Sequence, residues 1–325
     1  MEDLSRVTNK NLSVNKVKTF PVSLSLEEIN KEMNLTIDTP HQPSKEEIID
    51  QGLEFHSQGN ILQAEKYYKK FIDLGFKDPI VFSNYGIILK DQGKLKEAEF
   101  LQREALLLNP NFANAHHNLG NILHILGKLK EAELSLRNAI KINPNHIIVY
   151  LNLGLILIEL GNLEEAEILT RKAIELNPQI ASAHLNLGTI LNQIGNLKEA
   201  EISTKKAIKI DPYLSDAHYN LGNILKDLGK SNEAQSSYLQ AIELNPNLAK
   251  AHYNLGNLLR DQGRLQQSLL SYLKAIELDE TLIEARGEIG KIQLKNSHHK
   301  EGLDNIRKAY GSIIFNNKNS NIVIN

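Results

Sequence analysis

Apolar residues recur along this chain at the spacing of an amphipathic helix, and the recurrence itself repeats. Residues 113–146 show the pattern in full, as two apolar stripes separated by a short break. The first stripe follows i, i+3, i+4, i+7 spacing: His116, Leu119, Gly120 and Leu123. The second stripe is built in the same way: Leu129, Ala132, Leu136, Ala139 and Ile140. Such spacing places each stripe on one face of an α-helix, so the segment predicts a pair of helices.

The helix pair returns every 34 residues without insertion. The counterparts of Gly120 are Gly52, Gly86, Gly154, Gly188, Gly222, Gly256 and Gly290. The counterparts of Ala139 are Ala105, Ala173, Ala207, Ala241, Ala275 and Ala309, and those of Pro144 are Pro110, Pro178, Pro212 and Pro246. A fixed period with small residues and proline in phase indicates a helical solenoid, whose units stack on their neighbours. We therefore predict an all-α fold of eight units: 45–78, 79–112, 113–146, 147–180, 181–214, 215–248, 249–282 and 283–316.

Each unit contains its own stop signals. In the third unit the helices are predicted over 115–126 and 129–142. Gly127 follows the first helix, and glycine enters the left-handed conformation without a Cβ penalty. Pro144 follows the second helix, and proline cannot continue a helix. We expect Gly120 to mark a close crossing of the two helices, where a larger residue would cost about 1–3 kcal/mol.

Both ends of the chain depart from the repeat. Residues 1–44 are polar and contain three prolines, which predicts a mostly disordered leader with one short helix over 26–35. A leader that folds back on the array or recruits a partner is the alternative. In the eighth unit Gly302 replaces the alanine found at this position in units one to six, as is typical of a terminal repeat. The predicted closing helix covers residues 300–315, and residues 317–325 are a predicted flexible tail.

Composition excludes several kinds of site. A formal charge of −2 over 325 residues gives no electrostatic reason to expect a nucleic acid or an anionic membrane as partner. The absence of cysteine excludes disulfides, thiolate catalysis and cysteine-ligated metals. No apolar run approaches the roughly 18 residues that span a bilayer, and the N-terminus has no signal-peptide pattern. We therefore expect a soluble, cytoplasmic protein without a cofactor, whose oligomeric state composition does not decide.

The residues that define the unit resemble a known family. The order Leu119–Gly120, Ala132, Leu136, Ala139 and Pro144, in a 34-residue helix–turn–helix, is similar to the tetratricopeptide repeat (TPR). Phrases such as AHYNLGN resemble, more narrowly, the TPR arrays of O-linked N-acetylglucosamine transferases and related bacterial proteins. The resemblance implies a right-handed superhelix whose concave surface binds peptides and carries an asparagine from each unit.

The first helix of each unit has a second stripe, at positions two, six, nine and thirteen, that lies away from the apolar stripe. Position six is asparagine in six consecutive units: Asn84, Asn118, Asn152, Asn186, Asn220 and Asn254. Position nine adds Asn121, Asn223 and Asn257. An amide side chain offers two donors and a carbonyl acceptor, so a row of amides can pair with the backbone of an extended peptide. We predict a peptide-binding site formed by these nine residues.

An alternative interpretation gives the amides a structural role, as caps or as bonds to the neighbouring unit. Asparagine is a poor residue for a helix interior, so its recurrence favours selection for the amide. Units of common ancestry are, however, not independent observations. The other stripe positions vary: Ile148 and Leu155 are apolar in unit four, whereas Asp216 and Asp227 are acidic in unit six. Specificity for a peptide would come from these differences.

Histidine also recurs in phase, which raises the question of a metal site. The residues are His116, His184, His218 and His252. Stacked helices lie about 8–10 Å apart, too far for successive copies to share one zinc ion, so we predict a packing role. The sequence contains no phosphate-binding loop, HExxH motif or nucleophile elbow. The Glu-rich second helices, with Lys or Arg nearby, predict a solvated face.

The sequence thus favours a non-enzymatic adaptor that holds an extended peptide or a partner's helix in the concave groove. Two alternatives stay open. Resembling bacterial arrays are often joined to glycosyltransferase or methyltransferase domains, so the chain could be the targeting module of an enzyme that is lost, truncated or separately encoded. It could also be an assembly factor for a membrane complex. The sequence does not identify the partner protein or its orientation.

Overall fold

The computed structural model of the chain describes residues 43–311, 313–316 and 321–324, and this part contains sixteen helices that form eight pairs. The first helices of the pairs are α2 (Lys45–Ser57), α4 (Pro79–Asp91), α6 (Ala113–Ile125), α8 (Ile147–Glu159), α10 (Ala181–Ile194), α12 (Ser215–Asp227), α14 (Ala249–Asp261) and α16 (Ile283–Lys295). The second helices are α3 (Ile61–Asp73), α5 (Leu95–Leu108), α7 (Leu129–Ile142), α9 (Leu163–Leu176), α11 (Leu197–Ile210), α13 (Ser231–Leu244), α15 (Leu265–Leu278) and α17 (His299–Tyr310). The predicted α-solenoid of eight helix pairs is confirmed. Residues 1–42, with the predicted leader helix over 26–35, lie outside the described residues.

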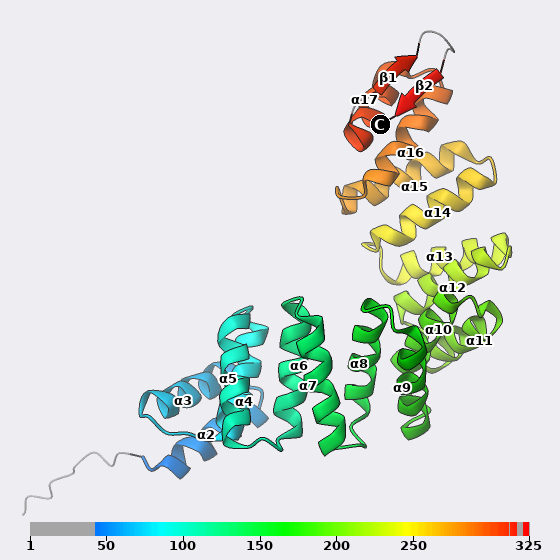
Figure 1. The fold of residues 1–325 in the computed structure, drawn as a ribbon. Coiled ribbons are helices and arrows are strands. Elements are labelled where there is room, and N and C mark those ends of the chain that lie inside the picture. Colours follow the sequence, from blue (N-terminus) through cyan, green and yellow to red (C-terminus); the bar gives the residue numbers. More distant parts are fainter. Residues whose placement is uncertain (1–42, 312, 317–320, 325) are drawn as a thin grey trace, which may run out of the picture.

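The pairs stack into an elongated array that changes direction along its length. In Figure 1 the helices α4 to α9 stand in a row, and the array then turns and continues through α10 to α17. Successive first helices contact one another from α4 through α6, α8, α10 and α12 to α14. Successive second helices within the described part show no comparable contact. The array therefore curves with its first helices on the inner side, and these helices form one continuous inner surface.

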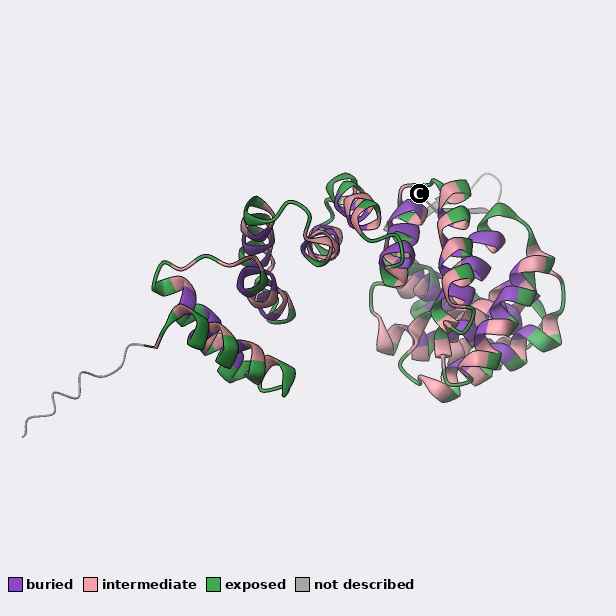
Figure 2. Ribbon diagram, turned by 90° about the horizontal axis from the view of Figure 1, so that it is seen from below, coloured by how far each residue is buried: buried purple, intermediate pink, exposed green. Residues whose placement is uncertain are grey.

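Small residues allow the two helices of a pair to cross closely, as the repeat predicted. A Cβ atom on Gly120 would lie 2.6 Å from Cδ2 of Leu136 and 3.4 Å from the carbonyl oxygen of Ala132. In the last pair a Cβ atom on Gly290 would lie 2.7 Å from the carbonyl oxygen of Gly302. Figure 2 shows that buried residues gather on the helix sides that face one another.

The connection between units is fixed by hydrogen bonds around the proline. Asn143 leaves the helical conformation before Pro144, and its side chain accepts a hydrogen bond from the backbone N–H of Asn145 (3.2 Å). A hydrogen bond to the proline carbonyl then comes from the fourth position of the next unit. The Nε2–H group of a histidine donates to the backbone oxygen of the proline six residues earlier, with N···O distances of 3.0–3.1 Å. The pairs are His116–Pro110, His184–Pro178, His218–Pro212 and His252–Pro246. Tyr150 donates from its hydroxyl to Pro144 in the same way. The recurring histidines therefore pack one unit against the loop that precedes it.

The outward faces of the second helices carry ion pairs, as their composition predicted. Arg137 of α7 binds Glu133 on its own helix and Glu165 on α9 (2.7 Å). Arg103 and Arg171 make the same link to Glu131 and Glu199. The side chains are partly exposed, so each pair contributes at most about 1 kcal/mol. None of the helices in the described ranges combines the length and apolarity needed to cross a bilayer.

The C-terminal end differs from the prediction of a closing helix over 300–315. Helix α17 ends at Tyr310, and Gly311 has a φ of +87°. Strand β1 (Ile313–Asn316) then pairs antiparallel with β2 (Asn321–Ile324). The left-handed glycine ends the helix, and the β-branched residues of Ile313–Asn316 favour a strand. Of the predicted flexible tail, residues 321–324 form β2, and 317–320 and 325 lie outside the described residues.

The turn inside the last unit is built on serine where the other units use glycine. Gly127 has a φ of +73°, and Ser297, its counterpart in the eighth unit, has a φ of +64°. A side chain in the left-handed region costs about 1–2 kcal/mol, of which the greater freedom of glycine in the unfolded chain offsets part. We therefore expect Ser297→Gly to raise the free energy of unfolding by about 1 kcal/mol.

The reciprocal substitution is the matched control. Gly127→Ser should lower the free energy of unfolding by a similar amount, because it places a side chain in the same conformation. Chemical denaturation of both variants checks the pair. Equal destabilisation by both changes would contradict this explanation of the turn.

Candidate functional site: the inner asparagine surface

The asparagines at position six lie on the inner surface, half-buried between neighbouring first helices. Most donate an amide hydrogen bond to the preceding unit. Nδ2 of Asn118 donates to Ser83 Oγ (3.1 Å), that of Asn152 to Asn121 Oδ1 (2.8 Å), that of Asn220 to Thr189 Oγ1 (2.8 Å) and that of Asn254 to Asn223 Oδ1 (2.8 Å). Nδ2 of Asn84 donates to the hydroxyl of Tyr68 on α3 (3.4 Å). The donor half of these amides therefore joins one unit to the next.

The asparagines at position nine are engaged through their carbonyl oxygens. Oδ1 of Asn223 accepts from the hydroxyl of Tyr238 (2.8 Å), and Oδ1 of Asn257 accepts from that of Tyr272 (2.7 Å). Both tyrosines are fully buried, so each hydroxyl needs a partner. Burial raises the pKa of Tyr272 to about 12. Asn121, Asn223 and Asn257 thus belong to the packing of the array, which is the role that the alternative interpretation gave to the amides.

The amide carbonyl oxygens of the asparagines at position six are not used in the packing of the array. Within residues 43–311, Oδ1 of Asn118, Asn152, Asn220 and Asn254 accepts no hydrogen bond. Asn186 forms no hydrogen bond at all through its side chain in that range. The inner surface accordingly presents a row of amide acceptors on five consecutive first helices, and all of these amides except Asn186 are held in place by their own donors.

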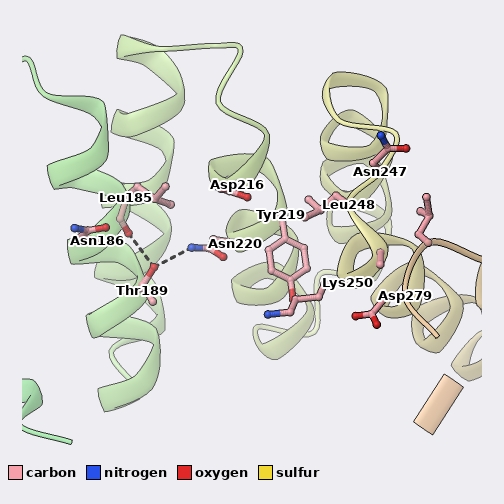
Figure 3. A pocket seen from close by; sticks show the side chains of 12 residues that line it. Leu185, Asn186, Thr189, Asp216, Tyr219, Asn220, Asn247, Leu248, Lys250 and Asp279 are labelled. Carbon is pink, nitrogen blue, oxygen red and sulfur yellow. Dashed lines mark hydrogen bonds between the residues drawn. The ribbon is translucent and has the colours of Figure 1, made fainter. Parts of the chain in front are cut away.

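The inner surface is hollowed between α10, α12 and the start of α14. A hollow of about 580 Å³ lies there, and Figure 3 shows side chains from all three helices around it. Asn220 bonds to Thr189, whose hydroxyl in turn donates to the backbone oxygen of Leu185 (3.1 Å). Tyr219 adds an aromatic ring, Lys250 adds a positive charge, and Asp216 and Asp279 add negative charges. This hollow can receive a side chain with both apolar and polar parts.

The surface changes character along the array. On α8, Ile148 and Leu155 are exposed, which gives the apolar patch that the sequence predicted for unit four. In the eighth unit Glu288 takes the place of the asparagine and binds both Arg260 and Lys291 (2.7 Å each). Burial favours the neutral acid, but the two ion pairs outweigh it and lower the pKa of Glu288. The amide row therefore ends where this ion-pair cluster begins.

No group of three or more histidine, aspartate or glutamate side chains in the described ranges is placed to hold a metal ion. The repeated histidines instead hydrogen-bond to proline carbonyls, as described above.

Family models for the TPR match most of the helical array. A model described as "TPR repeat" matches residues 120–161 and 222–259. Models described as "Tetratricopeptide repeat" match residues 249–282, residues 101–133, 169–202 and 204–236, and residues 81–112 and 147–180. Together the matches cover residues 81–202 and 204–282, which is more than half of the chain. The chain belongs to the tetratricopeptide repeat family.

Two of the solved structures that match the chain share its fold. A tetratricopeptide repeat protein from Parabacteroides merdae is 21% identical over 77% of this chain and 98% of its own, with a TM-score of 0.62. The APC/C hetero-tetramer Cut9–Hcn1 gives 15% identity over 77% of this chain and 46% of that chain, with a TM-score of 0.61. YrrB, described as "a TPR protein with an unusual peptide-binding site", is 22% identical over 57% of this chain and 95% of its own, with a TM-score of 0.44.

At these identities the likeness shows the fold alone. No curated protein matches the chain, and the narrower resemblance to the transferase arrays stays an expectation from the sequence.

One histidine of the inner TPR surface was not singled out by the sequence. His117 lies beside His146, with ring centroids 5.0 Å apart, and its Nε2 lies 3.0 Å from Nδ2 of Asn121 and 3.1 Å from Nδ2 of Asn152. Because both amide nitrogens donate, Nε2 must accept, and the ring is neutral with its proton on Nδ1. Burial, with smaller contributions from His146 and Lys90, lowers the pKa of His117 to about 4.

This pKa predicts a pH dependence of stability. The unfolded chain takes up a proton on His117 near its ordinary pKa of 6.5, whereas the folded chain resists protonation until about pH 4. The contribution of His117 to the free energy of unfolding is therefore fully present above about pH 6.5 and is lost as the pH falls towards 4. We expect His117→Gln to reduce the fall in melting temperature between about pH 6.5 and 5.5, above the range in which ordinary carboxylates titrate.

Glutamine retains a carbonyl acceptor for the two amides but does not titrate. The control is the same substitution at the exposed His299. Thermal unfolding followed by circular dichroism measures both variants. The assignment fails if the pH profile of the His117→Gln variant equals that of the unaltered chain.

Proposed function

We propose that this TPR protein is a binding scaffold that holds an extended segment of another protein along its inner surface. The observation that carries the proposal is the row of half-buried amides at position six, whose acceptors are not used within the array and whose donors, except that of Asn186, are used there. An extended peptide presents backbone N–H groups along its edge, and these need acceptors. The proposal names a partner class and no reaction.

In a bonded amide, Nδ2 donates within the array and Oδ1 can still accept a hydrogen bond from a peptide. This arrangement makes the surface suited to binding. An asparagine whose Nδ2 is already bonded cannot rotate freely, so little conformational entropy is lost when Oδ1 accepts a further bond. Each such bond contributes about 0.5–1.5 kcal/mol net, so several must form together for useful affinity. Asn118, Asn152, Asn186, Asn220 and Asn254 lie on consecutive first helices and can act on one peptide.

Side-chain selectivity would come from what surrounds the row. The exposed Ile148 and Leu155 favour an apolar residue of the peptide near α8. The hollow beside Tyr219 and Lys250 favours a longer side chain two units further on. The proposed partner segment thus has an apolar part and a more polar part that are separated along its length.

Two single substitutions separate binding from stability. The side chain of Asn186 makes no hydrogen bond within residues 43–311. Asn186→Ala should therefore weaken peptide binding by a factor of about 3–10 and leave the melting temperature unchanged. Asn254 bonds to both Asn223 and Tyr219, so Asn254→Ala should in addition lower the free energy of unfolding by about 1 kcal/mol or more. Calorimetric titration with a peptide selected from a random library on the full chain measures the first effect, and thermal unfolding measures the second.

The same peptide tests the role of its backbone. N-methylation of alternate peptide bonds removes N–H donors without changing side chains and should weaken binding in a position-dependent way. Unchanged affinity of the Asn186→Ala variant, together with tolerance of N-methylation at every position, would refute the proposed amide contacts.

A further inference from the structure

The hollow between α10, α12 and the start of α14 contains hydrogen-bond acceptors that the array leaves unused. Asn186 and Asn220 occupy the same position on neighbouring first helices, and Oδ1 of neither residue accepts a hydrogen bond within residues 43–311. Asp216 lies one turn before Asn220 on the same face of α12, and its carboxylate forms no hydrogen bond or ion pair in that range. Three unused acceptors therefore line one hollow.

The donors next to Asn220 are already used inside the array. Its Nδ2 group donates to the hydroxyl of Thr189 (2.8 Å), and this hydroxyl donates to the backbone oxygen of Leu185 (3.1 Å). In Figure 3 the nitrogen of Asn220 faces Thr189, and its oxygen lies on the side of Tyr219. This side of the hollow therefore suits a ligand that brings several hydrogen-bond donors of its own.

The charges around the hollow do not cancel. Two carboxylates, those of Asp216 and Asp279, stand against the single ammonium group of Lys250. Hydrogen bonds from Thr281, together with a smaller contribution from the charge of Lys250, lower the pKa of Asp279. The positive charge of Lys250 thus acts on Asp279, and Asp216 keeps a negative charge without a partner. The hollow accordingly favours a cation over a neutral or acidic group.

An aromatic ring in a fixed position borders the hollow. The hydroxyl of Tyr219 accepts a hydrogen bond from Nδ2 of Asn254 (3.2 Å), and its ring is tilted against that of Tyr238, with centroids 6.2 Å apart. These two contacts hold the ring from neighbouring elements. A cation is attracted to the face of an aromatic ring, and a planar guanidinium group also stacks on it.

We propose that the hollow binds the side chain of an arginine in the peptide that the inner surface holds, so this inference rests on the function proposed above. The guanidinium group has five N–H donors and can bond to Asp216 and to the amide oxygens of Asn186 and Asn220 while it lies against Tyr219. A lysine ammonium group is a more strongly hydrated point charge with three donors, which suits it less to several separate acceptors. The partner segment then has an apolar residue at α8 and an arginine at the hollow.

Nuclear magnetic resonance with a blocked arginine tests the hollow without a peptide. N-acetyl-arginine methylamide, titrated into the full chain, should shift the side-chain amide signals of Asn186 and Asn220. The citrulline analogue has a similar shape but no charge, and charge-assisted hydrogen bonds are roughly twice as strong as neutral ones, so it should bind about 10-fold more weakly. Equal shifts by both compounds, or no shift at these two residues, would overturn the proposal.

A matched pair of variants identifies the carboxylate. Asp216→Asn should weaken binding of the blocked arginine by about 10-fold and leave binding of the citrulline analogue nearly unchanged. Asp73→Asn, an equally conservative change at an exposed aspartate on α3, should alter neither. Circular dichroism should show unchanged helicity in both variants, because both side chains are exposed. An Asp216→Asn variant that binds the blocked arginine as well as the Asp73→Asn variant does would contradict the assignment.

The peptide selected on the full chain distinguishes this proposal from the function proposed above. Replacement of its arginine by citrulline should weaken binding to the unaltered chain by about 10-fold and to the Asp216→Asn variant by less than about 2-fold. A selected peptide that lacks arginine or tolerates citrulline, but still loses affinity for the Asn186→Ala variant, would refute the arginine site and leave the scaffold intact. A chain that binds the blocked arginine but no peptide would contradict the scaffold and support the preference of the hollow for a guanidinium group.

Discussion

Each helix pair in the described part of the chain has an apolar side that a neighbouring pair covers, and the whole array depends on this burial. Leu119 and Leu136 of the third unit share one core with Val149 and Leu153 of the fourth, and Ile190 of the fifth reaches the same cluster. No unit has a closed core of its own, so stability arises from neighbour contacts that repeat along the chain. The same constraint explains the close crossing at Gly120, because a wider helix pair would shift every later unit.

The stacking also determines what the inner surface can do. First helices pack against first helices, and the polar groups between them must find partners in the next unit. Position six meets this need with the Nδ2 group of asparagine, which leaves Oδ1 on the open side. A side chain with only a donor or only an acceptor could not hold two units together and also offer a group to a partner. The amide is suited to this position because it carries both.

The sequence predicted the architecture because the 34-residue period, the turn glycines and the prolines determine locally where each helix begins and ends. The stacking of the units follows from these positions. It did not predict the partners of the amides. The bonds from Asn152 to Asn121 and from Asn254 to Asn223 depend on the rise and rotation between units, which no local pattern contains. His117 was missed for the same reason, since its partners come from two units. The C-terminal hairpin was missed because the repeat was extended past Gly311, although the residues of Ile313–Asn316 favour a strand.

The central claim is that the inner amides join the units through nitrogen and offer oxygen to a partner. Nuclear magnetic resonance tests this most directly, because it observes the side-chain amide nitrogen and its protons separately from the carbonyl. We expect the Nδ2 protons of Asn152 and Asn254 to exchange slowly with water and those of Asn186 to exchange quickly. An added peptide should perturb the carbonyl carbons while the slow exchange persists. Equally fast exchange at all three residues, or a peptide that releases the protected protons, would contradict it.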